Sequence, residues 1–251
     1  MCGRYASSRH PADLVEEFEI DELRVSSALE ENYNVAPTDE VYAVLERPPR
    51  AGQGGAEDRP ERQLRTLRWG LVPSWAKDTS IGARMINARM ETVAAKPAYK
   101  RAFAKRRCLL PADGYYEWYE TQHKDAQGRP RKQPFFIRPA DQGTLAMAGL
   151  YELWPDPAKA ADDPTRWLWT CTVITTQAAD HLGRIHERMP LMVDRSAWDA
   201  WLDPTRPGSL DLLVPASPDV LEAYPVATLV SNVRNNGPRL IEPLPLEEAL
   251  T

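Results

Sequence analysis

The sequence predicts an α+β protein, a single domain over residues 1–251 with a mixed, mainly antiparallel, barrel-like β-sheet flanked by helices. Strand-like segments outnumber helical ones and do not alternate regularly with them, which favours such a sheet. No internal repeat is visible, and 251 residues suffice for one large core. Two segments rich in proline, glycine or charge, 47–63 and 156–165, are predicted to be exposed loop insertions within this domain.

The N-terminal part of the chain is predicted to hold two helices, a loop and two strands. The segment 31–38 is expected to be a loop, because Asn34 and Pro37 interrupt both the helical and the strand period. Periodicity predicts short helices over 11–20 and 21–30 and strands over 41–45 and 64–72.

The rest of the chain is predicted to supply most of the sheet. A helical composition over 87–106 is interrupted at Pro97, and two strands meet at an Asp113-Gly114 turn within 108–120. A hairpin loop is expected over 123–133. The remaining predicted elements are strands over 134–139, 144–154 and 166–176, helices over 176–186 and 194–203, and a last strand over 224–231.

The composition is that of an ordinary soluble globular protein, with 43% hydrophobic and 27% charged residues. No stretch approaches the roughly 20 apolar residues that a membrane helix needs. The N-terminus lacks the apolar run of a secretory signal. We therefore expect an intracellular, cytoplasmic protein with no membrane partner.

Cysteine and histidine usage predicts neither a disulfide framework nor a metal site. The three cysteines, Cys2, Cys108 and Cys171, are far apart and form no C-x-x-C pair, and the four histidines lack H-E-x-x-H spacing. Cys171 shares a strand face with Trp169 and Val173, so it is expected in the core, as is Cys108. We expect no metal and no cofactor, and Cys2 is the candidate reagent.

Charge is unevenly distributed along the chain, although the formal net charge is −5. Between Arg84 and Arg107 there are eight cations and one anion, Glu91, so this segment carries a net charge of +7. A local basic zone of this kind attracts a phosphate backbone whatever the total charge of the protein. A solvated helix face is an equally good explanation of the same pattern at this stage.

The chain begins Met-Cys-Gly-Arg-Tyr, which places a thiol beside the chain end. Methionine is usually removed before a small second residue, so we expect the mature chain to begin at Cys2. An α-amine with a pKa of about 7.7–8.0 is substantially neutral near physiological pH and attacks aldehydes to give Schiff bases. The neighbouring thiol then closes onto the imine carbon to form a five-membered thiazolidine, a reaction that only an N-terminal cysteine offers.

Several polar stretches are poorly suited to core strands, although each has a structural explanation when taken alone. Asn87 is explained as a helix cap, Glu117 as a salt-bridge partner, Trp75 as a lid over the core and His186 as a structural histidine. In order along the chain, the stretches are MCGRY, NVAPT (34–38), WGLVPSW (69–75), NARMET (87–92), RCLLPADGYYEW (107–118) and HERMP (186–190).

Together these motifs resemble the SRAP (SOS response-associated peptidase) family, abasic-site-processing proteins of the HMCES and YedK type. The resemblance runs from Cys2 to SNVRNNGP (231–238). It implies a single SRAP domain that captures abasic sites in single-stranded DNA through a covalent crosslink to the N-terminal cysteine. We expect a monomer, although the sequence does not determine the oligomeric state. Lyase and autoproteolytic activities are implied as well.

Carried over residue by residue, the resemblance gives Cys2 as the nucleophile, Glu117 and His186 as acid/base groups and Asn87 as a positioning residue. The DNA-binding residues that it implies are Arg4, Asn34, Pro37, Thr38, Trp75, Arg89, Trp118 and Arg188.

Acid/base chemistry gives the helper residues separate tasks. Opening the abasic sugar requires a proton on its ring oxygen, which suits His186 as a general acid. Moving protons from the amine to the departing hydroxyl suits Glu117. Its neighbours Tyr116 and Trp118 are expected to raise its pKa by desolvation if the carboxylate points into the same pocket.

Two other functions remain open from the sequence. In the first, the α-amine acts as a base for the Cys2 thiol, and the protein is an N-terminal cysteine peptidase. In the second, the basic zone and the aromatic residues form a non-covalent single-stranded DNA-binding module, and Cys2 is incidental. A covalent adduct with abasic DNA would indicate crosslinking, and cleavage of a protein substrate would indicate the peptidase. A salt-sensitive gel shift without an adduct would indicate the binding module.

Overall fold

Five strands close into a barrel in the computed structural model, which describes residues 2–48, 59–178, 182, 184–215 and 217–249. They are β4 (Glu40–Arg47), β5 (Glu61–Trp69), β7 (Arg107–Ala112), β10 (Leu145–Pro155) and β11 (Trp167–Gln177). The antiparallel order is β11-β10-β7-β4-β5, and a parallel pairing of β5 with β11, with Trp69 opposite Cys171, closes the ring. The predicted α+β class with a mixed, mainly antiparallel, barrel-like sheet is confirmed.

Alternate residues of the barrel strands face inward and outward, as the pleat of a strand requires. On β4, Val41 and Leu45 belong to the interior cluster, whereas Tyr42 belongs to the cluster on the outer surface. Cys108 and Cys171 are fully buried in the interior, as predicted. The outer cluster is covered by α1 (Pro11–Glu17), α2 (Pro97–Lys105) and α4 (Trp198–Leu202).

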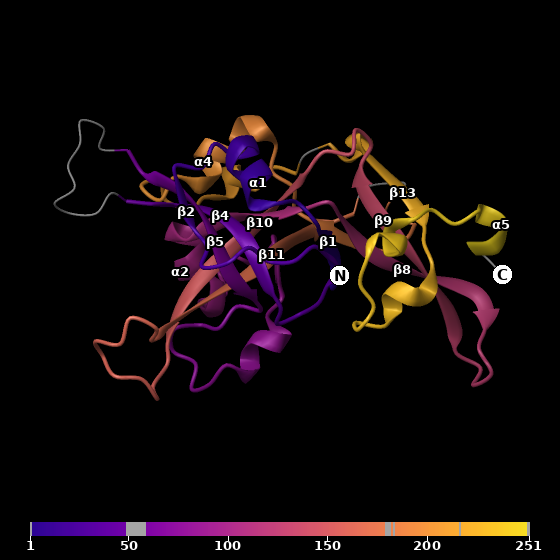
Figure 1. Cartoon of the computed structure of the whole chain (residues 1–251), viewed down its shortest axis with the longest axis horizontal. Helices are drawn as coiled ribbons and strands as arrows, with labels where there is room; N and C mark the ends of the chain where they lie inside the picture. Colours follow the sequence, from indigo (N-terminus) through magenta and orange to yellow (C-terminus); the bar gives the residue numbers. More distant parts are fainter. Residues whose placement is uncertain (1, 49–58, 179–181, 183, 216, 250–251) are drawn as a thin grey trace.

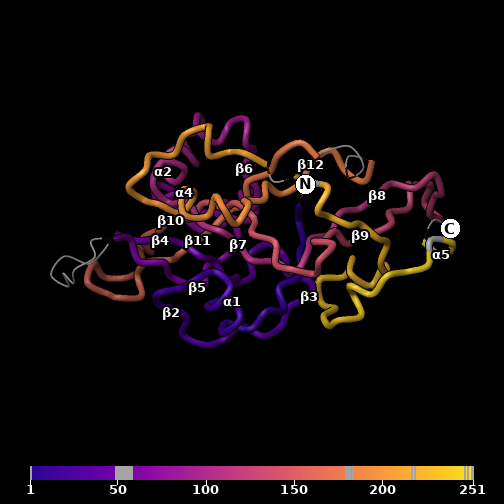
Figure 2. Tube along the Cα trace, turned by 90° about the horizontal axis from the view of Figure 1, so that it is seen from above, coloured from indigo at the N-terminus to yellow at the C-terminus, as the bar shows by residue number. Residues whose placement is uncertain are grey.

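A second, five-stranded antiparallel sheet lies beside the barrel (Figures 1 and 2). Its order is β13 (Leu221–Pro225), β9 (Pro130–Pro139), β8 (Gly114–Lys124), β1 (Tyr5–Ser7) and β3 (Asn32–Val35). The chain passes from the barrel into this sheet at Gly114, where a Cβ would collide with the ring of Phe136. Tyr5, Tyr115 and Ile137 of this sheet join the interior cluster of the barrel, so the sheet covers one barrel end.

Two short strands pair with β11 at this covered end. β6 (Asn87–Arg89) pairs with β11 in parallel, with Asn87 opposite Val173. β12 (Arg188–Pro190) pairs with β11 in antiparallel fashion, with Pro190 opposite Thr175. Both strands therefore bring predicted site residues to the end of the barrel that the second sheet covers. A further short strand, β2 (Glu22–Arg24), and a C-terminal helix, α5 (Leu246–Ala249), complete the named elements.

Three predicted elements of the N-terminal half are wrong, because tertiary pairing outweighs local propensity. The segment 21–30 is not a helix, since β2 pairs there with the open edge of β5. The segment 31–38 is not all loop, because β3 pairs with β1. The stretch 87–96 holds β6 followed by turns, so a helix begins only at Pro97.

The C-terminal half follows the prediction more closely. The helix predicted over 194–203 is present as a short 3-10 turn followed by α4. The last strand, predicted over 224–231, is mostly displaced, since β13 spans Leu221–Pro225 and 228–231 is a 3-10 helix. For the helix predicted over 176–186, β11 continues to Gln177, whereas 179–181 and 183 lie outside the described residues.

The two predicted insertions join barrel strands. The end of the segment 47–63 belongs to β5, and its residues 49–58 lie outside the described part of the chain. The segment 156–165 connects β10 with β11 and is mostly exposed. Among the described residues, no helix combines the length and the apolar character needed to cross a membrane.

Candidate active site

Cys2 lies directly before β1 and points into the covered end of the barrel. Its side chain is fully buried and belongs to the same interior cluster as Trp69 and Tyr115. Burial, with a smaller contribution from the Glu117 carboxylate, raises the pKa of the Cys2 thiol far above its ordinary value. The sulfur is therefore a protonated thiol at neutral pH.

Asn87 fixes the backbone of Cys2. Its side-chain nitrogen Nδ2 donates a hydrogen bond of 2.7 Å to the Cys2 carbonyl oxygen. Its other side-chain atom, Oδ1, is buried and accepts no hydrogen bond from the described residues. A buried acceptor of this kind is expected to have a partner, so Oδ1 is available to a donor on a bound molecule.

Glu117 lies on β8 with its carboxylate on the Cys2 side of the strand. Only 4% of Glu117 is exposed, and this burial raises the pKa of its carboxyl group to about 7. Tyr116 and Trp118 point to the opposite face of β8, where their ring centroids are 6.4 Å apart. The expectation that these two aromatic residues desolvate Glu117 is therefore wrong, because neighbouring residues of a strand face opposite ways.

Tyr115 is the residue that the sequence analysis missed in this site. It is buried on the Glu117 side of β8, and its hydroxyl has no hydrogen-bond partner among the described residues. Burial raises the pKa of Tyr115 well above its usual range, and the nearby Cys2 and Glu117 add to the effect. Tyr115 lies two positions before Glu117, and side chains two positions apart on a strand share a face, so the sequence could have placed Tyr115 beside Glu117.

His186 approaches Glu117 from the segment before β12. Its Nδ1 accepts a 3.0 Å hydrogen bond from the Arg188 backbone, which leaves the ring proton on Nε2. That Nε2 lies 4.0 Å from a carboxylate oxygen of Glu117. Burial lowers the pKa of His186, so the imidazole is mainly neutral at pH 7. The structure thus brings Cys2, Asn87, Glu117 and His186 together.

Arg4 and Asn34 form a linked pair beside this group. Arg4 donates to the Asn34 side-chain oxygen at 2.6 Å and to the Val230 carbonyl at 2.9 Å, and its guanidinium lies 5.9 Å from the Trp118 ring centroid. The Asn34 amide donates to the carbonyls of Val230, Asn232 and Asn235. Asn34 is buried and its polar atoms are occupied, so it positions the segment 228–236, and its contact with DNA stays a prediction.

Pro37 and Thr38 form the turn between β3 and β4. Thr38 has a positive φ of 79°, and its backbone N–H donates to the Trp69 carbonyl at 2.8 Å. A left-handed threonine is uncommon and persists only where its surroundings hold it. The turn is thus fixed against Trp69, whose ring lies in the same interior cluster as Cys2.

Trp75 lies elsewhere, in the loop that follows β5. It is 63% exposed, which excludes its alternative role as a lid over the core. The next residue, Ala76, accepts a hydrogen bond from Trp154 near the end of β10. Trp75 therefore lies toward the start of β11, and Arg188 bonds to Thr175 near the other end of that strand.

Arg89 and Arg188 differ in how their charges are used. Arg89 is exposed at the end of β6. Arg188 forms two hydrogen bonds with the Glu91 carboxylate, at 2.6 and 3.1 Å, and a third with the Thr175 carbonyl at 2.6 Å. A phosphate that approached Arg188 would have to compete with Glu91.

Part of the predicted basic segment 84–107 is structural. Arg107 is buried and donates to five backbone carbonyls, those of Phe103, Ala104, Trp201, Asp203 and Arg206. Arg106 forms a 2.8 Å ion pair with Glu152. The charge that this segment presents to a ligand is therefore lower than its net value of +7. Among the described residues, no group of three or more His, Cys, Asp and Glu side chains could hold a metal ion.

The sequence matches a family model described as "SOS response associated peptidase (SRAP)" over residues 1–233. It is 38% identical to the abasic site processing protein YoqW of Bacillus subtilis, over 96% of this chain and 99% of that protein. It is 32% identical to the abasic site processing protein YMR114C of Saccharomyces cerevisiae, over 97% of this chain and 61% of that protein. It is 35% identical to the abasic site processing protein HMCES of Gallus gallus, over 75% of this chain and 60% of that protein.

Solved structures share the fold. A crystal structure of a Bacteroides thetaiotaomicron protein matches with a TM-score of 0.76 at 23% identity, over 97% of this chain and all of that one. A phage-related protein from Bordetella bronchiseptica matches with a TM-score of 0.63 at 25% identity, over 90% of this chain and 94% of that one.

Proposed function

The chain belongs to the SOS response associated peptidase (SRAP) family, and from that premise we propose that it processes abasic sites in single-stranded DNA through a covalent crosslink to Cys2. The relatives compared above are named abasic site processing proteins. The observation that carries the proposal is the meeting of Cys2, Asn87, Glu117 and His186 at the covered end of the barrel. A buried carboxyl group with a raised pKa beside a chain end is suited to proton transfer there.

The reaction begins after Met1 is removed and Cys2 carries the α-amine. The amine nitrogen attacks the aldehyde carbon of the ring-opened sugar, and loss of one water gives an imine. The sulfur then adds to the imine carbon while its proton passes to the nitrogen. The products are a thiazolidine, which joins protein and DNA, and one molecule of water.

The environment of the Cys2 sulfur favours this order of steps. Its raised pKa keeps the thiol protonated, so the amine is the first nucleophile and the sulfur reacts second, within one molecule. An N-terminal cysteine peptidase requires the opposite, a thiolate that attacks first. Burial of Cys2 therefore supports the crosslinking function over the peptidase.

Glu117 is the better proton carrier of the two acid/base candidates. With a pKa of about 7, its carboxyl group both accepts a proton from the amine and returns one to the ring oxygen or the departing hydroxyl. His186 was predicted to be the general acid, but its lowered pKa makes the imidazolium a minor species at pH 7. We assign His186 to donation of its Nε2 hydrogen, as a neutral ring, to Glu117 or to the sugar.

One side activity follows from the imine, and another precedes it. An imine that the sulfur has not closed makes the neighbouring sugar proton acidic, and β-elimination then breaks a carbon–oxygen bond of the DNA, which is a lyase reaction. Self-removal of Met1 accounts for the autoproteolytic activity expected of the chain. Arg4, Arg89 and Arg188 are assigned to the DNA backbone, and Pro37, Thr38, Trp75 and Trp118 to bases or sugars.

A Cys2→Ala variant tests the proposal by separating the amine from the thiol. Alanine is also small, so Met1 removal and the imine are retained, but no sulfur closes the ring. We expect loss of the adduct that survives denaturation, together with borohydride-trappable adduct and lyase products. A heat-stable adduct formed by Cys2→Ala without a reductant would exclude the thiazolidine.

A further inference from the structure

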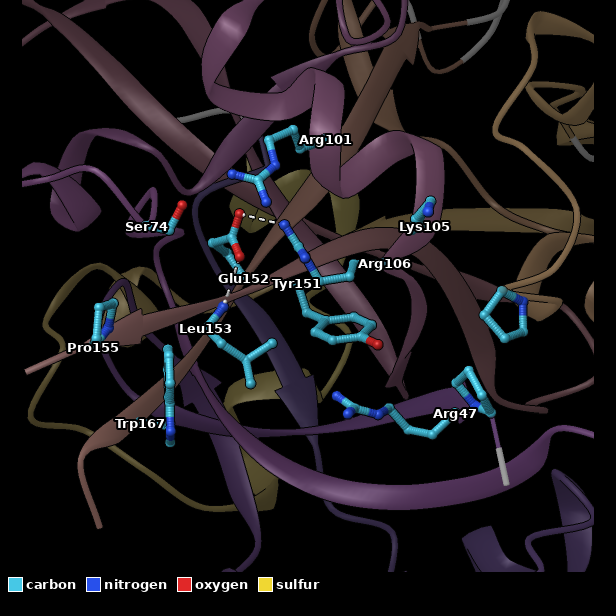
Figure 3. Close-up of a pocket in the computed structure, with 12 residues that line it drawn as sticks. Arg47, Ser74, Arg101, Lys105, Arg106, Tyr151, Glu152, Leu153, Pro155 and Trp167 are labelled. Carbon is cyan, nitrogen blue, oxygen red and sulfur yellow. Dashed lines mark hydrogen bonds and ion pairs between the residues drawn. The ribbon is translucent and has the colours of Figure 1, made fainter. Parts of the chain in front are cut away.

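A cavity of about 620 Å³ lies at the end of the barrel away from Cys2. Figure 3 shows Arg101 and Lys105 above it and Arg47 and Trp167 below. Trp167 begins β11, and Thr175, which bonds Arg188 beside the candidate active site, lies near the end of the same strand. At a strand rise of about 3.3 Å per residue, the two ends are roughly 26 Å apart.

The lining of this cavity is strongly cationic. It contains Arg47, Arg101, Lys105 and Arg106, and its one described carboxylate belongs to Glu152. That carboxylate is already used, because it accepts 2.8 Å and 2.9 Å hydrogen bonds from Arg106 and from the Leu153 backbone. The lining therefore holds no acid to offset the charges of Arg47, Arg101 and Lys105.

The placement of these cations concentrates their charge. Arg101 and Lys105 are four residues apart on α2, so they lie on one helix face, where like charges repel. Arg47 and Arg65 both lie over the Trp169 ring, at 5.4 and 4.3 Å from its centroid. A concave wall with this charge attracts a small anion.

Exposed aromatic side chains accompany the charge. Trp167 lines the cavity and is 48% exposed, and Trp75, 63% exposed, directly follows the lining residue Ser74. Large aromatic side chains are normally buried in a folded protein, whereas exposed rings beside cations are suited to stacking with nucleic acid bases. The basic segment also connects the two ends of the barrel, since Arg89 lies beside the candidate active site and Arg101 in the cavity.

We propose that this cavity binds one nucleotide unit, with its phosphate on Arg47, Arg101 and Lys105 and its base against Trp167. The unit has two possible sources, a DNA strand that continues from the candidate active site or a free nucleotide. The first source rests on the proposed function, because it requires the same strand to reach Cys2. The second does not.

The test compares an Arg101→Ala/Lys105→Ala variant with wild type and with Arg129→Ala. Arg129 is a highly exposed cation in the turn between β8 and β9, so Arg129→Ala controls for the loss of a surface charge outside the cavity. Binding of labelled, undamaged single strands is measured by anisotropy over a range of salt concentrations. One strand is too short to span both ends of β11, and the other is long enough. Binding of dAMP is followed by tryptophan fluorescence.

A DNA source predicts that the double variant loses about tenfold or more in affinity for the long strand and less for the short one, with the salt slope for the long strand reduced by about 1.4. A free-nucleotide source predicts that wild type binds dAMP and the double variant does not. The two proteins then bind the long strand with equal affinity, and likewise the short strand. No difference from Arg129→Ala in any of these measurements would overturn the proposal. Undamaged DNA requires no chemistry at Cys2, so failure of crosslinking leaves this result interpretable.

Discussion

The covered end of the barrel and its centre both contain buried cysteines, and at the covered end a carboxyl group with a raised pKa lies beside the cysteine. Cys108 and Cys171 are fully buried among barrel strands, and burial raises the pKa of each thiol, as it does for Cys2. Cys2 alone lies at a chain end beside Glu117. Thiol acidity therefore does not distinguish Cys2 from the two other cysteines. In the proposed function, the distinguishing features of Cys2 are the α-amine that Met1 removal would free and the carboxyl group of Glu117.

The largest effect is expected from blocking the chain end. A protein that retains any residue before Cys2 keeps the thiol in place but has no 1,2-aminothiol, so we expect no adduct with abasic single-stranded DNA. Cys108→Ala and Cys171→Ala should form the adduct normally and lose about 1–3 kcal/mol of unfolding free energy through lost packing. Intact mass and chemical denaturation measure the two properties. Normal adduct yield from the blocked protein would remove the basis of the comparison.

The next effect concerns the carboxyl group of Glu117, which lies beside Cys2. Glu117→Gln retains the shape of the side chain but not its proton transfer, so we expect adduct formation to slow by about 100-fold. Glu120→Gln, on the exposed part of the same strand, serves as the control. The single-turnover crosslinking rates of the two variants are compared. Equal rates for the two variants would show that Glu117 carries no proton in the reaction.

The raised pKa of Glu117 also predicts a pH-dependent stability. The folded state binds this proton up to about pH 7, whereas the unfolded state releases it near pH 4.5. The contribution of Glu117 is therefore most favourable below pH 4.5, falls between pH 4.5 and 7, and stays low above pH 7. The expected loss is about 3 kcal/mol, and Glu117→Gln should not show it. Urea denaturation at pH 5 and pH 8 measures this, and an unchanged pH profile in the variant would contradict it.

The smallest effect separates two arginines at the covered end. Arg89 is exposed, so Arg89→Ala should reduce the salt slope of single-strand binding by about 0.7. Arg188 is already paired with Glu91, so Arg188→Ala should change the slope by less. Fluorescence anisotropy with undamaged DNA at several salt concentrations gives both slopes. Equal reductions would mean that DNA displaces Glu91.

The sequence predicted the barrel because its strands are apolar runs that outnumber the helices, as on β4, where Val41 to Leu45 are all buried. It did not predict β2 or β6, because these strands have no pattern of their own and form by pairing with the edges of β5 and β11. Local sequence carries no information about such edges. For the same reason Asn87 was explained as a helix cap, although it lies on a strand.

The sequence predicted which residues form the candidate site but not how their side chains lie relative to one another. Motif order identified Cys2, Glu117 and His186, which the structure brings together. The neighbours that set their pKa values depend on which strand face each side chain takes and on the depth of burial. Asn34 illustrates the limit, because its hydrogen bonds to the segment 228–236 join residues almost 200 positions apart.

Peptide mapping of the adduct tests whether Cys2 forms a thiazolidine with the abasic sugar. Wild-type protein is reacted with abasic single-stranded DNA, digested, and treated with a thiol-alkylating reagent and an amine-labelling reagent before mass spectrometry. The account predicts that the sugar remnant lies on the peptide that begins at Cys2, with both its amine and its thiol resistant to labelling. A remnant on a lysine, or a Cys2 thiol that is still alkylated in the adduct, would contradict it.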